Sequence, residues 1–138
     1  MGSFDLLHPG HLQLLEWCRR MVGVYGEVVV TVNSDDFIAA YKGRPPVMGE
    51  SDRCAMVDAV KGVTAAYIHV HGPEAGPTIE TWLPAGGLLV IGADWRDRDY
   101  LGQLNVTQEW LDERGIVVVY VPLLAGHSST ALRERLGP

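Results

Sequence analysis

Two histidines flank a Pro-Gly step in the stretch His8-Pro9-Gly10-His11, directly before an apolar segment with helical periodicity. Pro9 fixes its own φ, and Gly10 lets the backbone approach a ligand closely. A helix that begins here presents unpaired N–H groups and a partial positive charge, which favour anions. Two imidazoles at this position can donate hydrogen bonds to phosphate oxygens and stabilise charge that builds up during phosphoryl or nucleotidyl transfer. The alternative is that His8 caps the helix and His11 packs in the core.

The elements that must position these histidines follow from the apolar pattern. Four short, nearly continuous apolar runs predict strands buried on both faces, at residues 27–33, 65–71, 88–94 and 116–122. Helical patterns cover residues 11–22, 51–60, 75–83, 106–115 and 128–136, with Ser51 as the expected N-cap of the second.

This alternation of strand and helix predicts a fold of the α/β class. We expect a Rossmann-like doubly wound parallel sheet with helices on both faces, in one domain over residues 1–138. In such folds a strand normally leads into the first ligand-binding turn, yet almost no chain precedes residues 2–5. We therefore expect the first strand to be missing or truncated, and we favour an incomplete start over a sheet that lacks the strand.

Composition excludes several classes of function. The net charge of -6 gives no basic footprint for nucleic acid, so an anionic small ligand would need a locally positive site. No apolar run is long enough for a membrane span, and no signal segment opens the chain. Cys18 and Cys54 lack metal-ligand spacing and are expected to be reduced thiols, which predicts a cytoplasmic protein.

The stretch GSFDLLHPGH at residues 2–11 resembles the signature G-[ST]-F-D-x-x-H-x-G-H of the cytidylyltransferase-like nucleotidyltransferase family. Four further segments resemble that family in the same order along the chain. These are VNSDDF (32–37), YKGRPPVM with the following helix to Arg53, IGADW (91–95) and GHSST (126–130). The GADW segment and the chain length are most similar to glycerol-3-phosphate cytidylyltransferases, which make CDP-activated polyols.

The resemblance implies a reaction. A phosphorylated small alcohol such as glycerol 3-phosphate attacks the α-phosphorus of a nucleoside triphosphate, with CTP favoured, and pyrophosphate leaves. It also implies assistance by Mg²⁺ and a homodimer, with no nucleic-acid or membrane partner and no metal site made by protein residues.

The resemblance also implies roles for individual residues. His8, His11 and Lys42 are expected to be catalytic, and Arg53 is expected to bind the acceptor. The alternatives are exposed loop charges for Lys42 and Arg44, and a structural salt bridge for Arg53. The expected nucleotide-binding residues are Gly2, Ser3, Phe4, Gly10, Arg44, Asp94, Ser128, Ser129 and Thr130, of which one of the last three is expected to serve as an N-cap.

The chain departs from the family pattern near its end. Leu123 and Leu124 stand where glycerol-3-phosphate-type enzymes have an Arg-Thr pair, and His127 stands where an isoleucine is usual. Three alternatives therefore stay open. One is an adenylyltransferase acting on a sugar phosphate, because the VNSD and KGRP stretches also resemble ADP-heptose synthases. The others are a catalytically degenerate nucleotide-binding protein and a purely structural α/β module.

Overall fold

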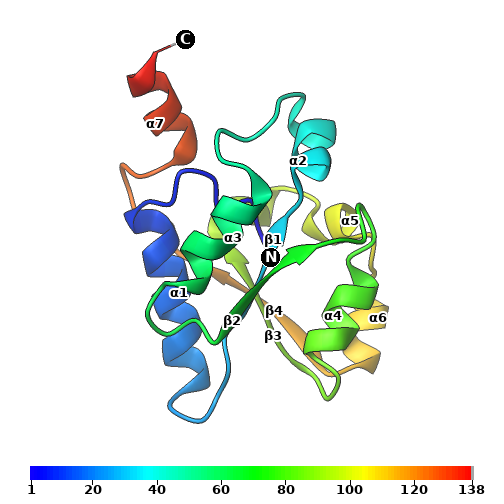
Figure 1. The fold of residues 1–138 in the computed structure, drawn as a ribbon. Coiled ribbons are helices and arrows are strands. Elements are labelled where there is room, and N and C mark those ends of the chain that lie inside the picture. The colour runs from blue at the N-terminus through cyan, green and yellow to red at the C-terminus, as the bar shows by residue number, and fades with distance from the viewer. Residues whose placement is uncertain (138) are drawn as a thin grey trace.

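Four parallel strands form the centre of the protein in a computed structural model that describes residues 1–137 (Figure 1). Strand β1 (Val29–Asn33) pairs with β2 (Ala65–His69), and β3 (Gly87–Gly92) pairs with β4 (Ile116–Val121). The predicted α/β class with parallel strands is confirmed. However, the described strands form two separate parallel pairs, β1-β2 and β3-β4, rather than one continuous sheet.

The helices connect and cover these strands. Each of the five predicted helical segments contains a helix, although the ends of these helices are shifted. A 3₁₀ helix follows β3 directly, where strand was predicted to continue to residue 94. No helix within residues 1–137 is long and apolar enough to cross a membrane. The helices are α1 (Pro9–Val22), α2 (Asp35–Lys42), α3 (Glu50–Asp58), α4 (Gly76–Trp82), η1 (Ala93–Asp97), α5 (Tyr100–Leu104), α6 (Gln108–Glu113) and α7 (Ser129–Leu136).

Two details of the sequence interpretation are wrong. Lys42 lies in the last turn of α2 rather than in a loop, because Ser34 caps this helix by accepting from the Phe37 N–H and Gly43 ends it with a left-handed φ of 71°. Ser51 is not an N-cap, because α3 already begins at Glu50 and its N-cap position is held by a glycine without a side-chain bond.

Two apolar clusters correspond to the two strand pairs. One gathers α1, α3 and β1 around Phe4, Leu15 and Val57. The other gathers α4, α5, α6, β3 and β4 around Ile79 and Leu111. The molecule therefore has a core in two parts, with the N-terminus of the chain between them.

The start of the chain bears on the expected truncated first strand. Gly2 forms one isolated parallel bridge with Val32, in which the Gly2 N–H donates to Thr31 O at 3.0 Å and the Asn33 N–H donates to Gly2 O at 2.8 Å. No strand precedes β1 among residues 1–137. The bridge occupies the place where such a strand would end.

Arg53 joins three segments beneath this bridge. Its side chain has no exposed surface, and its guanidinium donates to Met48 O at 2.8 Å, Ser3 O at 2.6 Å and Asn33 O at 2.8 Å. It also forms an ion pair with Asp35 at 2.7 Å. A planar group with five N–H donors can satisfy several carbonyls at once, which an ammonium group cannot do in the same geometry. Arg53 therefore fixes the 2–5 turn against the end of β1.

Replacing Arg53 by Met should lower the free energy of unfolding by about 3–5 kcal/mol, because three buried carbonyls lose their donor. Asp35→Asn removes only the ion pair to a carboxylate whose side chain is 42% exposed, so its cost should be about 1 kcal/mol or less. Urea unfolding of both variants measures the difference. Equal losses would contradict a role of Arg53 that depends on the three carbonyls.

Candidate active site

A cavity of about 460 Å³ opens at the carboxyl ends of the strands. This is the edge at which doubly wound sheets bind ligands. Its walls come from the 2–11 turn, the end of α2, the β3–η1 junction and the start of α7. All of the predicted catalytic and nucleotide-binding residues line it: Gly2, Ser3, Phe4, His8, Gly10, His11, Lys42, Arg44, Asp94, Ser128, Ser129 and Thr130.

The turn that enters the cavity is held in an uncommon conformation. Phe4 and Leu6 have φ values of 52° and 51°, in the left-handed region that residues with a side chain seldom adopt. The Phe4 ring is buried in the α1–β1 cluster, and Arg53 holds the adjoining Ser3 carbonyl. Packing and hydrogen bonds therefore impose a backbone shape that the turn would not adopt alone.

His8 and His11 cap α1 reciprocally. The Gly10 N–H donates to His8 Nδ1 at 3.0 Å, and the His8 N–H donates to His11 Nδ1 at 3.2 Å. The two ring centroids lie 3.8 Å apart. A Cβ atom on Gly10 would lie 2.7 Å from the His8 ring, so only glycine fits between the two histidines. The alternative that His8 caps the helix is confirmed, and His11 takes part in the same cap; both imidazoles also line the cavity.

These contacts fix the protonation of the rings. A ring nitrogen that accepts a hydrogen bond carries no proton, so each neutral imidazole has its N–H at Nε2. Burial is the main cause that lowers the pKa of His11 to about 4. His8 and Lys42 lower this pKa further, and Asp5 opposes them. Burial and the neighbouring His127 lower the pKa of His8. At neutral pH the pair can therefore offer neutral N–H donors.

Asp5 connects the turn to two distant segments. Its buried carboxylate accepts from the Val47 and Met48 N–H groups, each at 2.9 Å, and forms an ion pair with Arg133. Ser129 Oγ donates to the Asp5 carbonyl. Burial alone would raise the pKa of Asp5, but these N–H donors and the guanidinium outweigh burial and lower it. Asp5 is thus a structural anchor rather than a metal ligand.

Arg133 lines the cavity and escaped the sequence analysis. A signal for it was present, because Ser129 and Arg133 are four residues apart and so share a helix face. Nothing in the local sequence showed that this face meets Asp5, which lies 124 residues away from Ser129.

Cations line one side of the cavity. Lys42 and Arg44 are exposed there, and Lys42 Nζ lies 5.5 Å from the centre of the Tyr41 ring. Arg98, which the sequence did not indicate, also lines the cavity, with its guanidinium 5.4 Å from the centre of the Trp95 ring near the end of β3. An otherwise acidic chain thus has the local positive site that an anionic ligand requires.

The opposite side is formed at the end of β3. Asp94 is exposed in η1, and Trp95 packs against the β3–β4 core with its ring 5.3 Å from that of Tyr100. Leu123 lies so close to Gly92 that a Cβ atom on this glycine would be 2.8 Å from it. A carboxylate beside apolar and aromatic side chains is a surface suited to a nucleoside.

The start of α7 completes the cavity. Ser128 is the N-cap, since its Oγ accepts from the Ala131 N–H at 3.0 Å, and this confirms that one of the three hydroxyl residues is a cap. Ser129 is bound to Asp5. The hydroxyl of Thr130 and the first N–H groups of α7 are the groups here that suit a phosphate.

Arg53 is the one predicted site residue that does not line the cavity. Its guanidinium has no exposed atom for an acceptor and forms the structural ion pair that was the alternative for it. Residues 1–137 also contain no group of three or more His, Cys, Asp or Glu side chains that could hold a metal ion.

Known proteins share this chain's sequence pattern. The cytidylyltransferase-like family model matches residues 1–135. An FAD synthase from Methanopyrus kandleri is 35% identical over 115 residues, which cover 83% of this chain and 71% of that protein. A bifunctional protein HldE from Koribacter versatilis is 36% identical over 137 residues, which cover 97% of this chain but only 26% of that protein.

A solved structure shares the fold as well. The lipopolysaccharide core biosynthesis protein from Thermoplasma volcanium superposes with a TM-score of 0.63 at 27% identity, over 89% of this chain and 91% of that one. With the signature turn, the paired histidines and the cavity at the strand ends in place, the family match over residues 1–135 leads to one conclusion: the chain belongs to the cytidylyltransferase-like family of nucleotidyltransferases.

Proposed function

We propose that this nucleotidyltransferase transfers a nucleotidyl group from a nucleoside triphosphate to a phosphorylated small molecule in the 460 Å³ cavity. A phosphate oxygen of the acceptor forms a bond to the α-phosphorus, the bond from that phosphorus to the α–β bridging oxygen breaks, and pyrophosphate leaves. The observation that supports this most is the convergence of two neutral imidazoles, several cationic side chains and two helix N-termini on one cavity.

The roles follow from the chemistry of each group. His8 and His11 donate from Nε2 to phosphate oxygens, and these bonds strengthen as charge accumulates in the transition state. Lys42 and Arg44 bind the triphosphate, the lysine through the charge of its ammonium group and the arginine through paired hydrogen bonds from its guanidinium. Gly2, Ser3 and Phe4 shape the turn that receives the nucleotide, and the first turn of α7 binds its terminal phosphates.

ATP is the donor that we favour. Among the relatives, one is named FAD synthase, and FAD contains an adenylyl group joined to FMN. Leu123 and Leu124 also line the cavity at the positions where a glycerol-3-phosphate cytidylyltransferase is expected to have an Arg-Thr pair. CTP with glycerol 3-phosphate is the second candidate, favoured by the GADW segment at the end of β3. We assign to Asp94, which lines the cavity, the role of accepting a hydrogen bond from the ribose or the base.

Calorimetric titration of ATP, CTP, GTP and UTP, each with and without Mg²⁺, tests the donor. We expect ATP to bind at least about tenfold more tightly than CTP, a difference of about 1.4 kcal/mol. Because the oxygens of a triphosphate bind Mg²⁺ directly, we expect Mg²⁺ to have an effect only when a nucleotide is present. A preference for CTP would select the second candidate.

Pyrophosphate release with FMN, a sugar phosphate or glycerol 3-phosphate then identifies the acceptor. Binding of a nucleotide without pyrophosphate release for any acceptor would indicate the degenerate nucleotide-binding alternative. The predicted homodimer is tested in the same samples by light scattering.

His11→Ala should lower kcat by about 100-fold or more while the Kd of the nucleotide changes by less than about fivefold, because its hydrogen bond strengthens in the transition state. His11→Gln is the matched variant, since glutamine at this position can still accept from the N-cap N–H and keep the helix cap. His71→Ala, at an exposed residue outside the cavity, is the control. Equal losses of kcat and affinity would contradict a catalytic role for His11.

Nucleotide binding should take up protons at acidic pH, just above the pKa of about 4 of the free His11. His11 is neutral in the free protein, with a pKa of about 4, and an adjacent triphosphate raises this pKa. Affinity should therefore weaken as pH rises from about 4 through the pKa of the complex. Calorimetry in two buffers of different ionisation enthalpy counts the protons, and His11→Gln should take up fewer. An identical count in both proteins would exclude His11 as the titrating group.

A further inference from the structure

His69 is a buried histidine that the proposed chemistry does not use. Four of the five histidines line the active-site cavity, and the roles given above involve only His8 and His11. His69 is the last residue of β2, and only 2% of its surface is exposed. Burial lowers its pKa, so the ring is neutral at neutral pH. A neutral imidazole donates one hydrogen bond and accepts another, so its two partners show what it holds.

The two ring nitrogens of His69 connect three segments of the chain. Nε2 lies 2.9 Å from Gly72 O, and Nδ1 lies 2.9 Å from Thr78 Oγ1. A carbonyl oxygen can only accept, so Nε2 carries the proton and donates, and Nδ1 accepts from the Thr78 hydroxyl. His69 therefore joins the end of β2 to the start of α4 and to the turn of residues 70–75 between them.

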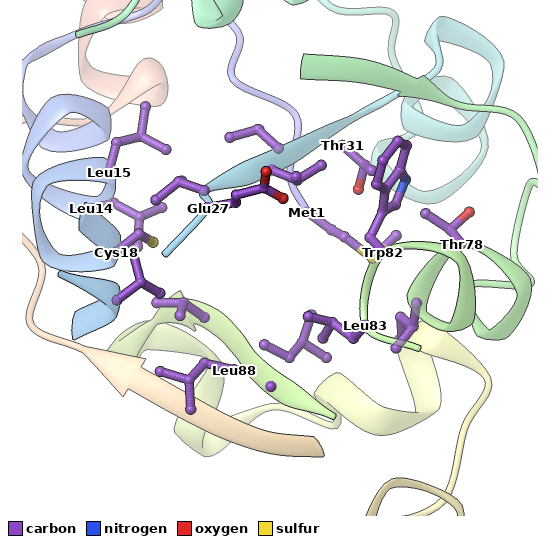
Figure 2. Close-up of a pocket in the computed structure, with 18 of the residues that line it drawn as sticks. Met1, Leu14, Leu15, Cys18, Glu27, Thr31, Thr78, Trp82, Leu83 and Leu88 are labelled. Atoms are coloured by element: carbon purple, nitrogen blue, oxygen red, sulfur yellow. The ribbon is translucent and has the colours of Figure 1, made fainter. Parts of the chain in front are cut away.

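Thr78 holds the ring from outside the active-site cavity. A second cavity, of about 320 Å³, lies between the two strand pairs, and Thr78 lines it together with Trp82 and Leu83 (Figure 2). The lining of this second cavity is mostly apolar and includes no histidine. His69 lines the active-site cavity instead. The bond from Thr78 thus fixes the imidazole on the side away from the candidate active site.

The bond to Gly72 holds a turn that is part of the active-site wall. Gly72 and Pro73 line the cavity, and Gly72 has a left-handed φ of 56°. The next part of the turn has a bond of its own, in which the Ala75 N–H donates to Leu104 O at 3.1 Å. Gly72 is held by His69. Loss of the imidazole would therefore release Gly72 and Pro73 while Ala75 stays bound.

The 70–75 turn lies in a part of the cavity to which the proposed nucleotide contacts do not extend. The nucleoside is assigned to the side of Asp94, and its phosphates to Lys42, Arg44 and the starts of α1 and α7. A group of lining residues without such a role comes from the ends of β1 and β2, from α2 and from the turn; it comprises Asn33, Phe37, Tyr41, His69, Gly72 and Pro73. The acceptor must lie beside the nucleotide for its phosphate to reach the α-phosphorus, so we assign this part of the cavity to it.

Aromatic rings give this group of residues a defined shape. The rings of Phe37 and Tyr41 lie 5.2 Å apart, and the ring of His69 meets that of Phe37 edge-on at 6.5 Å. The Tyr41 hydroxyl is hydrogen-bonded to Ser3 Oγ at 3.2 Å. His69 thus packs against Phe37 and holds Gly72 at the same time. None of the six side chains is charged at neutral pH, so the group suits the uncharged part of an acceptor.

We propose that His69 is a positioning residue for the phosphorylated acceptor. The buried imidazole fixes Gly72 and Pro73 as one wall of an acceptor subsite, and Phe37 and Tyr41 form the neighbouring wall. The ring itself contacts no reacting group; it keeps the wall in the place that directs the acceptor phosphate to the α-phosphorus. This inference rests on the proposed function, because an acceptor subsite requires a transfer reaction.

Steady-state kinetics of His69 variants test this role. Pyrophosphate release is measured with FMN, glucose 1-phosphate and glycerol 3-phosphate, and the acceptor with the highest kcat/KM is used for the variants. His69→Leu should raise the KM of that acceptor at least about tenfold, while the Kd of the nucleotide changes by less than about twofold. His69→Gln, whose amide N–H can donate to Gly72 O, should bring this KM back to within about threefold of the wild-type value.

Thr78→Val is the matched control. It removes the other partner of His69 at a residue outside the active-site cavity, so the acceptor KM should stay within about threefold of the wild-type value. The double variant His69→Leu/Thr78→Val replaces both partners of a buried pair by apolar groups, which limits the loss of stability. It should have the same acceptor KM as His69→Leu. An equal rise of KM in Thr78→Val and His69→Leu would overturn the role of the bond to Gly72.

The outcomes separate this inference from the proposed function. An active wild-type protein whose acceptor KM is unchanged in His69→Leu would overturn the inference alone. A nucleotide Kd that rises in His69→Leu by the same factor as the acceptor KM would do so as well. A wild-type protein that releases no pyrophosphate with any of the three acceptors would overturn the proposed function, and this inference with it.

Discussion

The guanidinium of Arg53 is the contact on which the shape of the active site depends. It binds the carbonyls of Ser3 and Asn33, which belong to the turn below the histidines and to the end of β1. Without a common donor, these carbonyls would be buried and unpaired, and the left-handed residues Phe4 and Leu6 would relax. The helix that carries Arg53 thus contributes to the site without touching the cavity.

Asp5 has a similar function from within the turn. Its carboxylate holds the loop at Val47 and Met48 and the guanidinium of Arg133, so one residue connects three segments that are distant in sequence. Asp5 and Arg53, which was expected to bind the acceptor, therefore both hold other segments in place. Asp5 itself lines the cavity, whereas Arg53 does not.

Much of this arrangement was predictable from the sequence. Strands that are buried on both faces have continuous apolar runs, so they can be found in the sequence. The arrangement of His8 and His11 is also predictable, because Gly10 and the hydrogen bonds that cap α1 lie within a few residues of each other. What could not be predicted is long-range. The contacts of Arg53 to Ser3 and Arg133 to Asp5 span 50 and 128 residues, and no periodicity reports them. The helix α2 was missed for another reason, since its short length hid the capping signals of Ser34 and Gly43.

The last helix has a different relation to the rest of the molecule. No residue of α7 is buried, and its polar ties run from Ser129 and Arg133 to the single residue Asp5 (Figure 1). An element without a buried apolar face can detach at a small free-energy cost while the core stays folded. Its first turn is nevertheless part of the cavity wall. Docking of this helix and occupancy of the cavity are therefore thermodynamically linked, so that a ligand held by that turn is bound more weakly whenever the helix is released.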